Sequence, residues 1–427
     1  MKETVAMANP SFRINKNIVF VLLLLAYFFS YFFRISTSVV LPGLQEEWGL
    51  SAALVGFISS MYFYTYAIMQ PFCGALNDRF GPVRIVGAGM ALTCIGSALF
   101  GLAASPSLLI LGRLLQGVGL SPMISGLFVY QGTKYPPAMY TFLSGITLMV
   151  GNFGAVIAVY PLSAALTAWS RSSVFYMLAF VTFLITVGLF TAAFANKNEK
   201  TDESFRPMPP APPAVNLRGQ IREAFGIIKA SPDLTRIMAI WAIIMGAILT
   251  LQGLWAVAWF DAAYKPEGNT ASLAATMIGI GVMAGNMLGG RIGKPGKRHV
   301  AVRGCAFFTT ASWMLMLACF GLRLPLPLTA AVTTCVGIGT GVGLVQFASS
   351  QNALTPAGRG GGVFGIINTL NFIAGIVFQW GTGVIISIVV SLLGPENAQA
   401  GYLVAHAVIG GFMILACCIA VRIKPFA

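Results

Sequence analysis

The sequence predicts an all-α integral membrane protein with twelve transmembrane helices in two pseudo-symmetric six-helix bundles. Of its 427 residues, 57% are hydrophobic and only 9% are charged, and the mean hydropathy is +0.82. Soluble proteins average about 25% charged residues, so this chain lacks the charge to coat a water-facing surface. Apolar runs long enough to cross a bilayer recur along the chain, and one long polar stretch divides them into two equal sets.

Each predicted span is a run of about 20 mostly apolar residues, the length that crosses the hydrocarbon core as a helix. The first run is longer than the apolar region of about 7–15 residues in a cleaved signal peptide, so we expect it to remain as a span. In chain order the predicted spans are 17–41, 52–75, 84–103, 107–130, 139–165, 173–196, 235–261, 271–291, 300–322, 325–352, 361–387 and 401–421.

The polar stretch at 197–233 is predicted to be a cytoplasmic linker. It contains the proline-rich segment RPMPPAPPAV at 206–215, it is charged, and we expect it to be extended. It separates a predicted N-terminal bundle at 1–196 from a C-terminal bundle at 234–427. Six spans on each side of a linker indicate two similar halves related by an axis along the membrane normal.

Lysine and arginine predict the orientation. If the N-terminus is cytoplasmic, only Arg171, Lys265 and Arg323 fall in outer loops, and Arg34 and Arg113 lie within helices. The remaining 21 of the 26 basic residues then fall on the cytoplasmic side. This is a strong positive-inside bias, and it places both termini in the cytoplasm. The expected location is the bacterial inner membrane, with the chain as a multi-pass monomer.

The loop after span 2 carries a recognisable pattern. GALNDRFGPVR at 74–84 contains Gly74, Asp78, Arg79, Gly81 and Arg84, and a weaker echo, GGRIGKPGKR at 289–298, follows span 8. The first stretch resembles the signature loop G-x-L-x-D-R-x-G-x-(R/K)-(R/K) of the major facilitator superfamily, with Val83 as the departure. The resemblance implies that these five residues form a gating loop that latches the two halves together. The alternative for the same residues is an ordinary capped turn with positive charge on the cytoplasmic side.

A second pattern of that superfamily, R-x-x-Q-G-x-G, is similar to residues 113–119 in span 4, with Arg113 and Gln116 at its first two fixed positions. Together with twelve spans and a central linker, the resemblance covers essentially the whole chain. It implies the major facilitator fold and secondary transport. The pattern is associated with structural and coupling roles as well as with binding, so both remain open for Arg113.

Arg34 lies in the middle of span 1, where its charge costs about 2.5–3.5 kcal/mol on insertion scales. Tyr27, Tyr31 and Ser38 are spaced from it by multiples of a helical turn and therefore share its face. All twelve acidic residues fall in predicted loops or tails, except Asp261 at the outer end of span 7. We therefore expect a substrate anion to neutralise Arg34, through charge-assisted and bidentate hydrogen bonds. The alternative is a side chain that extends to the outer headgroups or to helix-end carbonyls.

Other spans supply polar and aromatic residues at helical spacing, which we expect to line a central cavity between the halves. Gln70 and Gln379 share these faces. The candidate substrate-binding residues are Arg34, Tyr31, Tyr27, Tyr62, Tyr66, Arg113, Gln116, Asn152, Gln252, Trp255, Gln346, Asn368 and Asn371.

A narrower resemblance concerns the substrate. The segment Tyr31-Phe-Phe-Arg34 is similar to the organophosphate:phosphate antiporter branch of the superfamily, in which arginines of spans 1 and 7 hold phosphate. Span 7 has no arginine here and presents Gln252 and Trp255 instead. This departure favours a carboxylate or sugar acid over an organophosphate. Symport of a proton and exchange for a counter-anion both remain open as coupling modes.

Several function classes are disfavoured. The basic residues are scattered singly, which argues against nucleic-acid binding, and the seven cysteines lie in apolar runs without metal-ligand spacing. No metal or cofactor is expected, and no catalytic set is available at membrane depth, so the chain is not expected to be an enzyme. The predicted function is secondary transport of a small organic anion. A transporter-like receptor that senses a ligand without net transport is the alternative.

Overall fold

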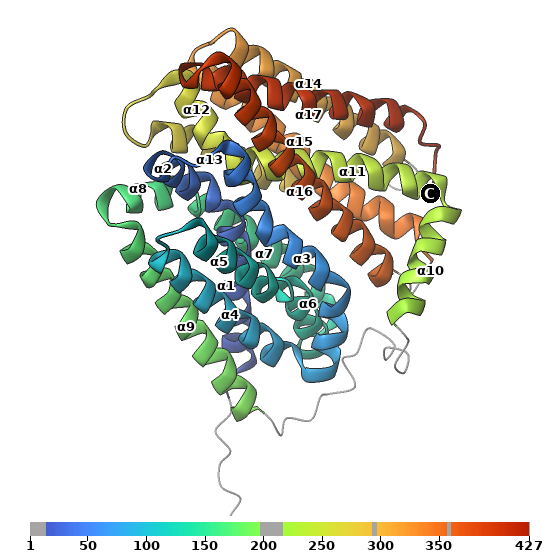
Figure 1. Ribbon diagram of the computed structural model, residues 1–427. Helices are drawn as coiled ribbons and strands as arrows, with labels where there is room; N and C mark the ends of the chain where they lie inside the picture. Colours follow the sequence, from blue (N-terminus) through green and yellow to red (C-terminus); the bar gives the residue numbers. More distant parts are fainter. Residues whose placement is uncertain (1–13, 197–216, 293–296, 357–359, 427) are drawn as a thin grey trace, which may run out of the picture.

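The structure, a computed structural model, describes residues 14–196, 217–292, 297–356 and 360–426. Within these ranges, twelve helical segments are long and apolar enough to cross a membrane, which confirms the predicted number of spans. Figure 1 shows them as two bundles, one built from α1–α9 and the other from α11–α17. The helices α3 and α16 pack along each other where the bundles meet.

Three of the six spans of the first bundle are interrupted. Span 1 comprises α1 and α2, span 4 comprises α5 and α6, and span 5 comprises α7 and α8. The helices are α1 (Lys16–Ile35), α2 (Thr37–Trp48), α3 (Ala52–Phe80), α4 (Pro82–Leu102), α5 (Pro106–Leu120), α6 (Met123–Lys134), α7 (Pro137–Ile157), α8 (Tyr160–Ala168) and α9 (Arg171–Ala195).

In the second bundle, span 7 contains a π-helical turn between two α-helices, and a short linker helix precedes the span. The elements are α10 (Leu217–Ala230), α11 (Pro232–Thr250), η2 (Leu251–Trp255), α12 (Ala256–Tyr264), α13 (Thr270–Gly289), α14 (Arg298–Gly321), α15 (Leu326–Leu354), α16 (Gly360–Leu393), η3 (Pro395–Asn397) and α17 (Ala398–Val421).

Two of the interruptions follow from proline. Pro122 stands between α5 and α6, and Pro161 is the second residue of α8. Proline has no N–H to donate, and its ring clashes with the carbonyl four residues earlier. The helix therefore ends before each proline and restarts in a new direction.

Glycine pairs set the closest helix contacts. A side chain at Gly285 of α13 would overlap the carbonyl oxygen of Ile338 in α15, and one at Gly341 would overlap that of Val282. Gly89 of α4 and Gly119 of α5 face each other in the same way in the first bundle. Small residues allow backbones to approach, which favours helix association in lipid by van der Waals contact.

The prediction that the linker is extended was wrong for residues 217–230. Residues 217–230 form α10, which packs on α16 and α11, whereas the proline-rich segment lies outside the described residues. Ala224 and Ile228 are four residues apart, and both are buried. This apolar face, too short to stand out in the sequence, stabilises the helix against the second bundle.

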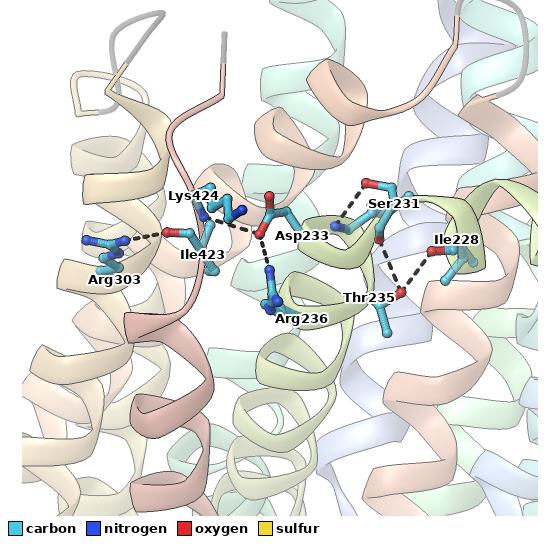
Figure 2. Close-up of polar contacts among 9 residues, drawn as sticks. Ile228, Ser231, Asp233, Thr235, Arg236, Arg303, Ile423 and Lys424 are labelled. Carbon is cyan, nitrogen blue, oxygen red and sulfur yellow. Dashed lines mark hydrogen bonds and ion pairs between the residues drawn. The ribbon is translucent and has the colours of Figure 1, made fainter.

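The end of the chain is held against the start of span 7 (Figure 2). Asp233 accepts a hydrogen bond from Arg236 Nη1 at 2.7 Å and another from the backbone N–H of Lys424 at 3.2 Å. Arg303 of α14 donates to the carbonyl oxygen of Ile423. The segment after α17 therefore ties α11 to α14 at one end of the second bundle.

We predict that Asp233→Ala lowers the free energy of unfolding by about 1–2 kcal/mol. The change removes a partly exposed ion pair, a carboxylate in the first turn of α11 and the acceptor for Lys424. The melting temperature in detergent measures the effect. Asp233→Asn keeps an acceptor oxygen, so its melting temperature should lie between those of the wild type and Asp233→Ala. An unchanged melting temperature for Asp233→Ala would show that the contact contributes no stability.

Candidate functional site

The interruption of span 1 lies two residues after Arg34. The helix α1 ends at Ile35, and Ser36 separates it from α2. The break frees carbonyl oxygens at the end of α1, which need new donors in a non-aqueous interior. Arg113 of α5 supplies one, because its Nη1 donates to Phe33 O at 2.6 Å, while its Nη2 donates to Ser59 O of α3 at 3.2 Å.

Span 7 is distorted at the corresponding point of the second bundle. The π-turn η2 covers Leu251–Trp255, and Gln379 of α16 donates to Leu249 O at 2.9 Å just before it. The two distortions meet, because Thr37 Oγ1 donates to Gly253 O at 2.9 Å. π-turns and broken membrane helices are frequent at functional sites, where freed backbone groups are satisfied by neighbouring side chains.

The Arg34 side chain lies beside these distortions and is only 6% exposed. Its Cζ is 4.5 Å from the ring centroid of Tyr31, 5.4 Å from that of Tyr66 and 5.3 Å from that of Phe372. Among the residues that the structure describes, no carboxylate pairs with Arg34. Aromatic faces attract the guanidinium by cation–π interactions, but they leave its hydrogen-bond donors available.

Several polar atoms around Arg34 are buried without a partner among the described residues. They are Arg34 Nε, the Tyr27 hydroxyl and Ser30 Oγ. The Tyr27 and Tyr31 rings are in edge contact at 5.3 Å. Buried polar atoms are normally hydrogen-bonded, so these unpaired atoms beside an unpaired arginine are candidates to bind a polar ligand.

Phe372 is a site residue that the sequence analysis missed. Its ring is 4.5 Å from that of Tyr66 and 5.7 Å from that of Phe63, so α16 of the second bundle closes over Arg34 of the first. One phenylalanine among many in membrane spans gives no sequence signal. Its position one residue after Asn371 was the only available indication.

The sequence predicted that Tyr27 and Tyr31 share the face of Arg34 and that Tyr62 and Tyr66 line a central cavity, and the structure brings the four rings together. Tyr31 and Tyr66 face the guanidinium directly, and Tyr62 stacks on Tyr66 at 5.5 Å. The Tyr62 hydroxyl donates to Ser30 O at 3.3 Å, whereas the Tyr27 hydroxyl is buried without a partner among the described residues.

Three other candidates of the first bundle make hydrogen bonds to groups other than Arg34. Arg113 is fully buried, with Tyr62 on one face at 4.7 Å. Gln116 Oε1 accepts a hydrogen bond from Arg113, and Asn152 Nδ2 donates to Leu148 O of its own helix. The predicted contact of these residues with substrate stays a prediction.

The candidates of the second bundle separate into two groups. Asn368 contacts the first bundle, because its Nδ2 donates to Gln70 Oε1 of α3 at 3.0 Å. Gln252 lies in η2, and Asn371 Oδ1 is buried without a partner among the described residues. Trp255 donates to Thr382 Oγ1 at 2.8 Å, and Gln346 donates to Gly289 O at 2.7 Å. These last two contacts lie within the second bundle.

The loop prediction for residues 74–84 was wrong in large part, because residues 74–80 form the last turns of α3, Gly81 alone separates the two helices, and Arg84 lies in the first turn of α4. Gly81 adopts a φ of 85°, where glycine is favoured, and it ends α3. Gly74, Arg79 and Arg84 are exposed, whereas the side chain of Asp78 lies outside the described residues. The latch therefore stays a prediction.

Hydrogen bonds between the bundles occur at the end that holds the turn at Gly49, which we name the predicted outer end. There Ala53 N donates to Ser387 Oγ at 2.9 Å, and Tyr160 N donates to Thr276 Oγ1 at 3.1 Å. Deeper in the molecule lie the Thr37 contact with η2 and the Asn368 contact with α3. The two halves are thus joined from this end to the level of the site.

We predict that Phe372→Leu weakens anion binding about 2–30-fold, because one face of the guanidinium loses a cation–π contact of about 0.5–2 kcal/mol. Phe372→Tyr keeps the ring and should bind nearly as the wild type does. The measurement is the dissociation constant of a stabilising anion for the purified protein. Equal constants for the leucine and wild-type proteins would contradict a role of Phe372 at the site.

The profile of the Major Facilitator Superfamily matches residues 23–379. The probable sulfoacetate transporter SauU of Cupriavidus necator is 30% identical over 146 residues, which cover 34% of this chain and 33% of that protein. The probable L-galactonate transporter of Escherichia coli is 36% identical over 102 residues, which cover 24% of this chain and 22% of that protein. The hexuronate transporter of Bacillus subtilis is 26% identical over 202 residues, covering 46% of each. The alignments thus span less than half of each relative.

Solved structures share the fold along nearly the whole chain. A bacterial homolog of the human lysosomal transporter Spinster, inward-facing and occupied, superposes with a TM-score of 0.71 at 15% identity, covering 97% of both chains. A D-xylose–proton symporter superposes with a TM-score of 0.72 at 13% identity, and the alignment covers 96% of this chain and 98% of the symporter. At these identities the likeness concerns the fold alone.

Proposed function

Because this chain belongs to the Major Facilitator Superfamily, we propose that it is a secondary transporter of a small organic anion, with Arg34 as the anion anchor. The observation that carries the proposal is the guanidinium itself. It is buried at the boundary of the two bundles, caged by three aromatic rings and unpaired with any described carboxylate. A buried charge is costly unless it is paired, and a substrate anion is the partner that fits this site.

The chemistry of the site favours a carboxylate, a sugar acid or an organophosphate with one main anionic group. A single guanidinium offers a planar set of donors to one carboxylate, and amide groups of Gln252, Asn368 and Asn371 lie on the opposite bundle to bind hydroxyls. The names of three relatives refer to organic acids: sulfoacetate, L-galactonate and hexuronate. These names support the organic-anion class.

The proposed mechanism is alternating access. The bundles are joined through hydrogen bonds of Ala53 and Tyr160 at the predicted outer end and of Thr37 deeper in the molecule, so entry from that side requires these bonds to break. Phe372 would then separate from Arg34, because the ring and the guanidinium belong to different bundles. An anion bound between them links the occupancy of the site to the relative position of the bundles.

We place the protein in a bacterial inner membrane with both termini in the cytoplasm, following the positive-inside bias of its loops. Acidic residues are missing from the interior of the predicted spans, and this supports exchange of two anions or entry of an anion with its own proton. The receptor alternative would require ligand binding without net transport.

The test is a thermal-shift screen of purified protein against monocarboxylates, dicarboxylates, sugar acids and sugar phosphates. A ligand that binds the folded state raises the melting temperature by mass action. We expect one anion class to stabilise the wild type and not Arg34→Gln, and the same anion to be taken up by proteoliposomes. Equal stabilisation of both proteins would overturn the anchor role, and binding without uptake would favour the receptor.

A further inference from the structure

A polar pocket lies at the predicted outer end of the second bundle, and Arg34 is not among its lining residues. It has a volume of about 280 Å³ and is formed by the end of α12, the turn between α14 and α15, and the start of α17. Two alanines and Tyr264 form part of its wall. Lys265, Arg323, Glu396 and Gln399 supply its charged and amide groups.

The backbone conformation singles out its two basic residues. Lys265 has a φ of 45° and Arg323 a φ of 49°, and among the described residues they are the two non-glycine residues with positive φ. Each follows the C-terminus of a helix, where glycine is the favoured residue for a left-handed conformation. Both strained positions line one pocket, and both carry a positive side chain. Strain of this kind concentrates at binding sites.

The arginine is held in place by its neighbours. Arg323 Nε donates to Gln399 Oε1 at 3.0 Å, and Gln399 Nε2 donates to Phe320 O at 2.9 Å. The Gln399 amide is thus held through both its oxygen and its nitrogen. Arg323 uses only Nε for this contact, so the two terminal nitrogens of its guanidinium remain to bind a ligand. The Tyr264 hydroxyl and Thr329 Oγ1 are 2.6 Å apart, which fixes the adjacent wall.

We infer that this pocket binds a monoanion, either the carboxylate of a solute or the phosphodiester of a lipid headgroup. The pocket carries two cationic groups and one carboxylate, Glu396, so its formal charge matches one negative charge and disfavours a dianion. Arg323 provides the paired donors and Lys265 the second positive charge. The site is independent of Arg34 and would stand if the anchor role failed.

The experiment uses the full-length Arg34→Gln protein, so that the central site does not contribute. Acetate binding is followed by saturation-transfer difference NMR in neutral detergent at constant ionic strength, with succinate as the dianion. We expect an acetate signal that falls at least about 5-fold in Arg323→Gln and in Lys265→Gln. Arg422→Gln, an exposed arginine outside the pocket, is the matched control and should keep the signal.

A second variant separates binding from structure. Arg323→Gly relieves the positive φ, so its melting temperature should equal or exceed that of the parent while acetate binding is lost. A lower melting temperature, or binding equal to the parent in all three pocket variants, would overturn the inference. Stronger binding of succinate than of acetate would overturn the charge assignment.

The two sources of the anion are distinguished in nanodiscs. If phosphatidylglycerol suppresses the acetate signal relative to phosphatidylcholine, and Arg323→Gly removes that difference, the site holds a lipid headgroup. An acetate signal of equal size in both lipids assigns the site to a soluble anion.

Discussion

Arg34→Gln is expected to abolish substrate uptake while leaving the protein folded. Removing one partner of a buried, hydrogen-bonded charge pair costs about 2–5 kcal/mol, which corresponds to a loss of at least about 30-fold. Folding should tolerate the change, because no hydrogen bond from Arg34 to a described residue is lost and an uncompensated buried charge is removed. Arg34→Lys keeps the charge without the planar donors, and we expect it to fail as well.

Uptake into proteoliposomes and the melting temperature in detergent together test this result. Arg422→Gln is the control, since it removes an exposed arginine with the same change in net charge. Near-wild-type uptake by Arg34→Gln would refute the anchor role. Loss of uptake accompanied by loss of the folded protein would instead assign Arg34 to structure.

Arg113→Gln should have the opposite profile, with its main effect on stability. The wild-type side chain donates to Phe33 O and Ser59 O, and it is fully buried. A shorter glutamine would lose both charge-assisted hydrogen bonds, although Phe33 O keeps Ser36 Oγ as a donor, so we expect a loss of about 2–4 kcal/mol. Transport should fall too, because Phe33 precedes Arg34 and the end of α1 would lose its cap.

The melting temperature and the yield of monodisperse protein measure this effect. Arg113→Lys keeps a positive donor and should be intermediate in stability. If Arg113→Gln melts like the wild type but no longer binds the anion, then Arg113 is a substrate ligand and its structural assignment is wrong. The variants of Arg34 and Arg113 therefore distinguish an arginine that binds substrate from one that stabilises the fold.

The fold followed from the sequence because its determinants are local. A run of about 20 apolar residues must form a helix in lipid, where each backbone group needs a partner within its own segment. The number of spans was therefore predicted, although their ends shifted by a few residues. Arg34 became a candidate by the same logic, since a charge within such a run is costly, and its role as anchor stays a prediction.

What the sequence left open depends on contacts between helices far apart in the chain. Arg34 and Arg113 are both arginines within spans, yet one faces the boundary between bundles and the other caps a broken helix. Phe372, which the sequence did not indicate, packs against Tyr66 beside Arg34. Residues 217–230 form α10 on the second bundle, where an extended linker was expected. Packing decided these roles, because a helix break redirects the chain and so determines which side chains meet.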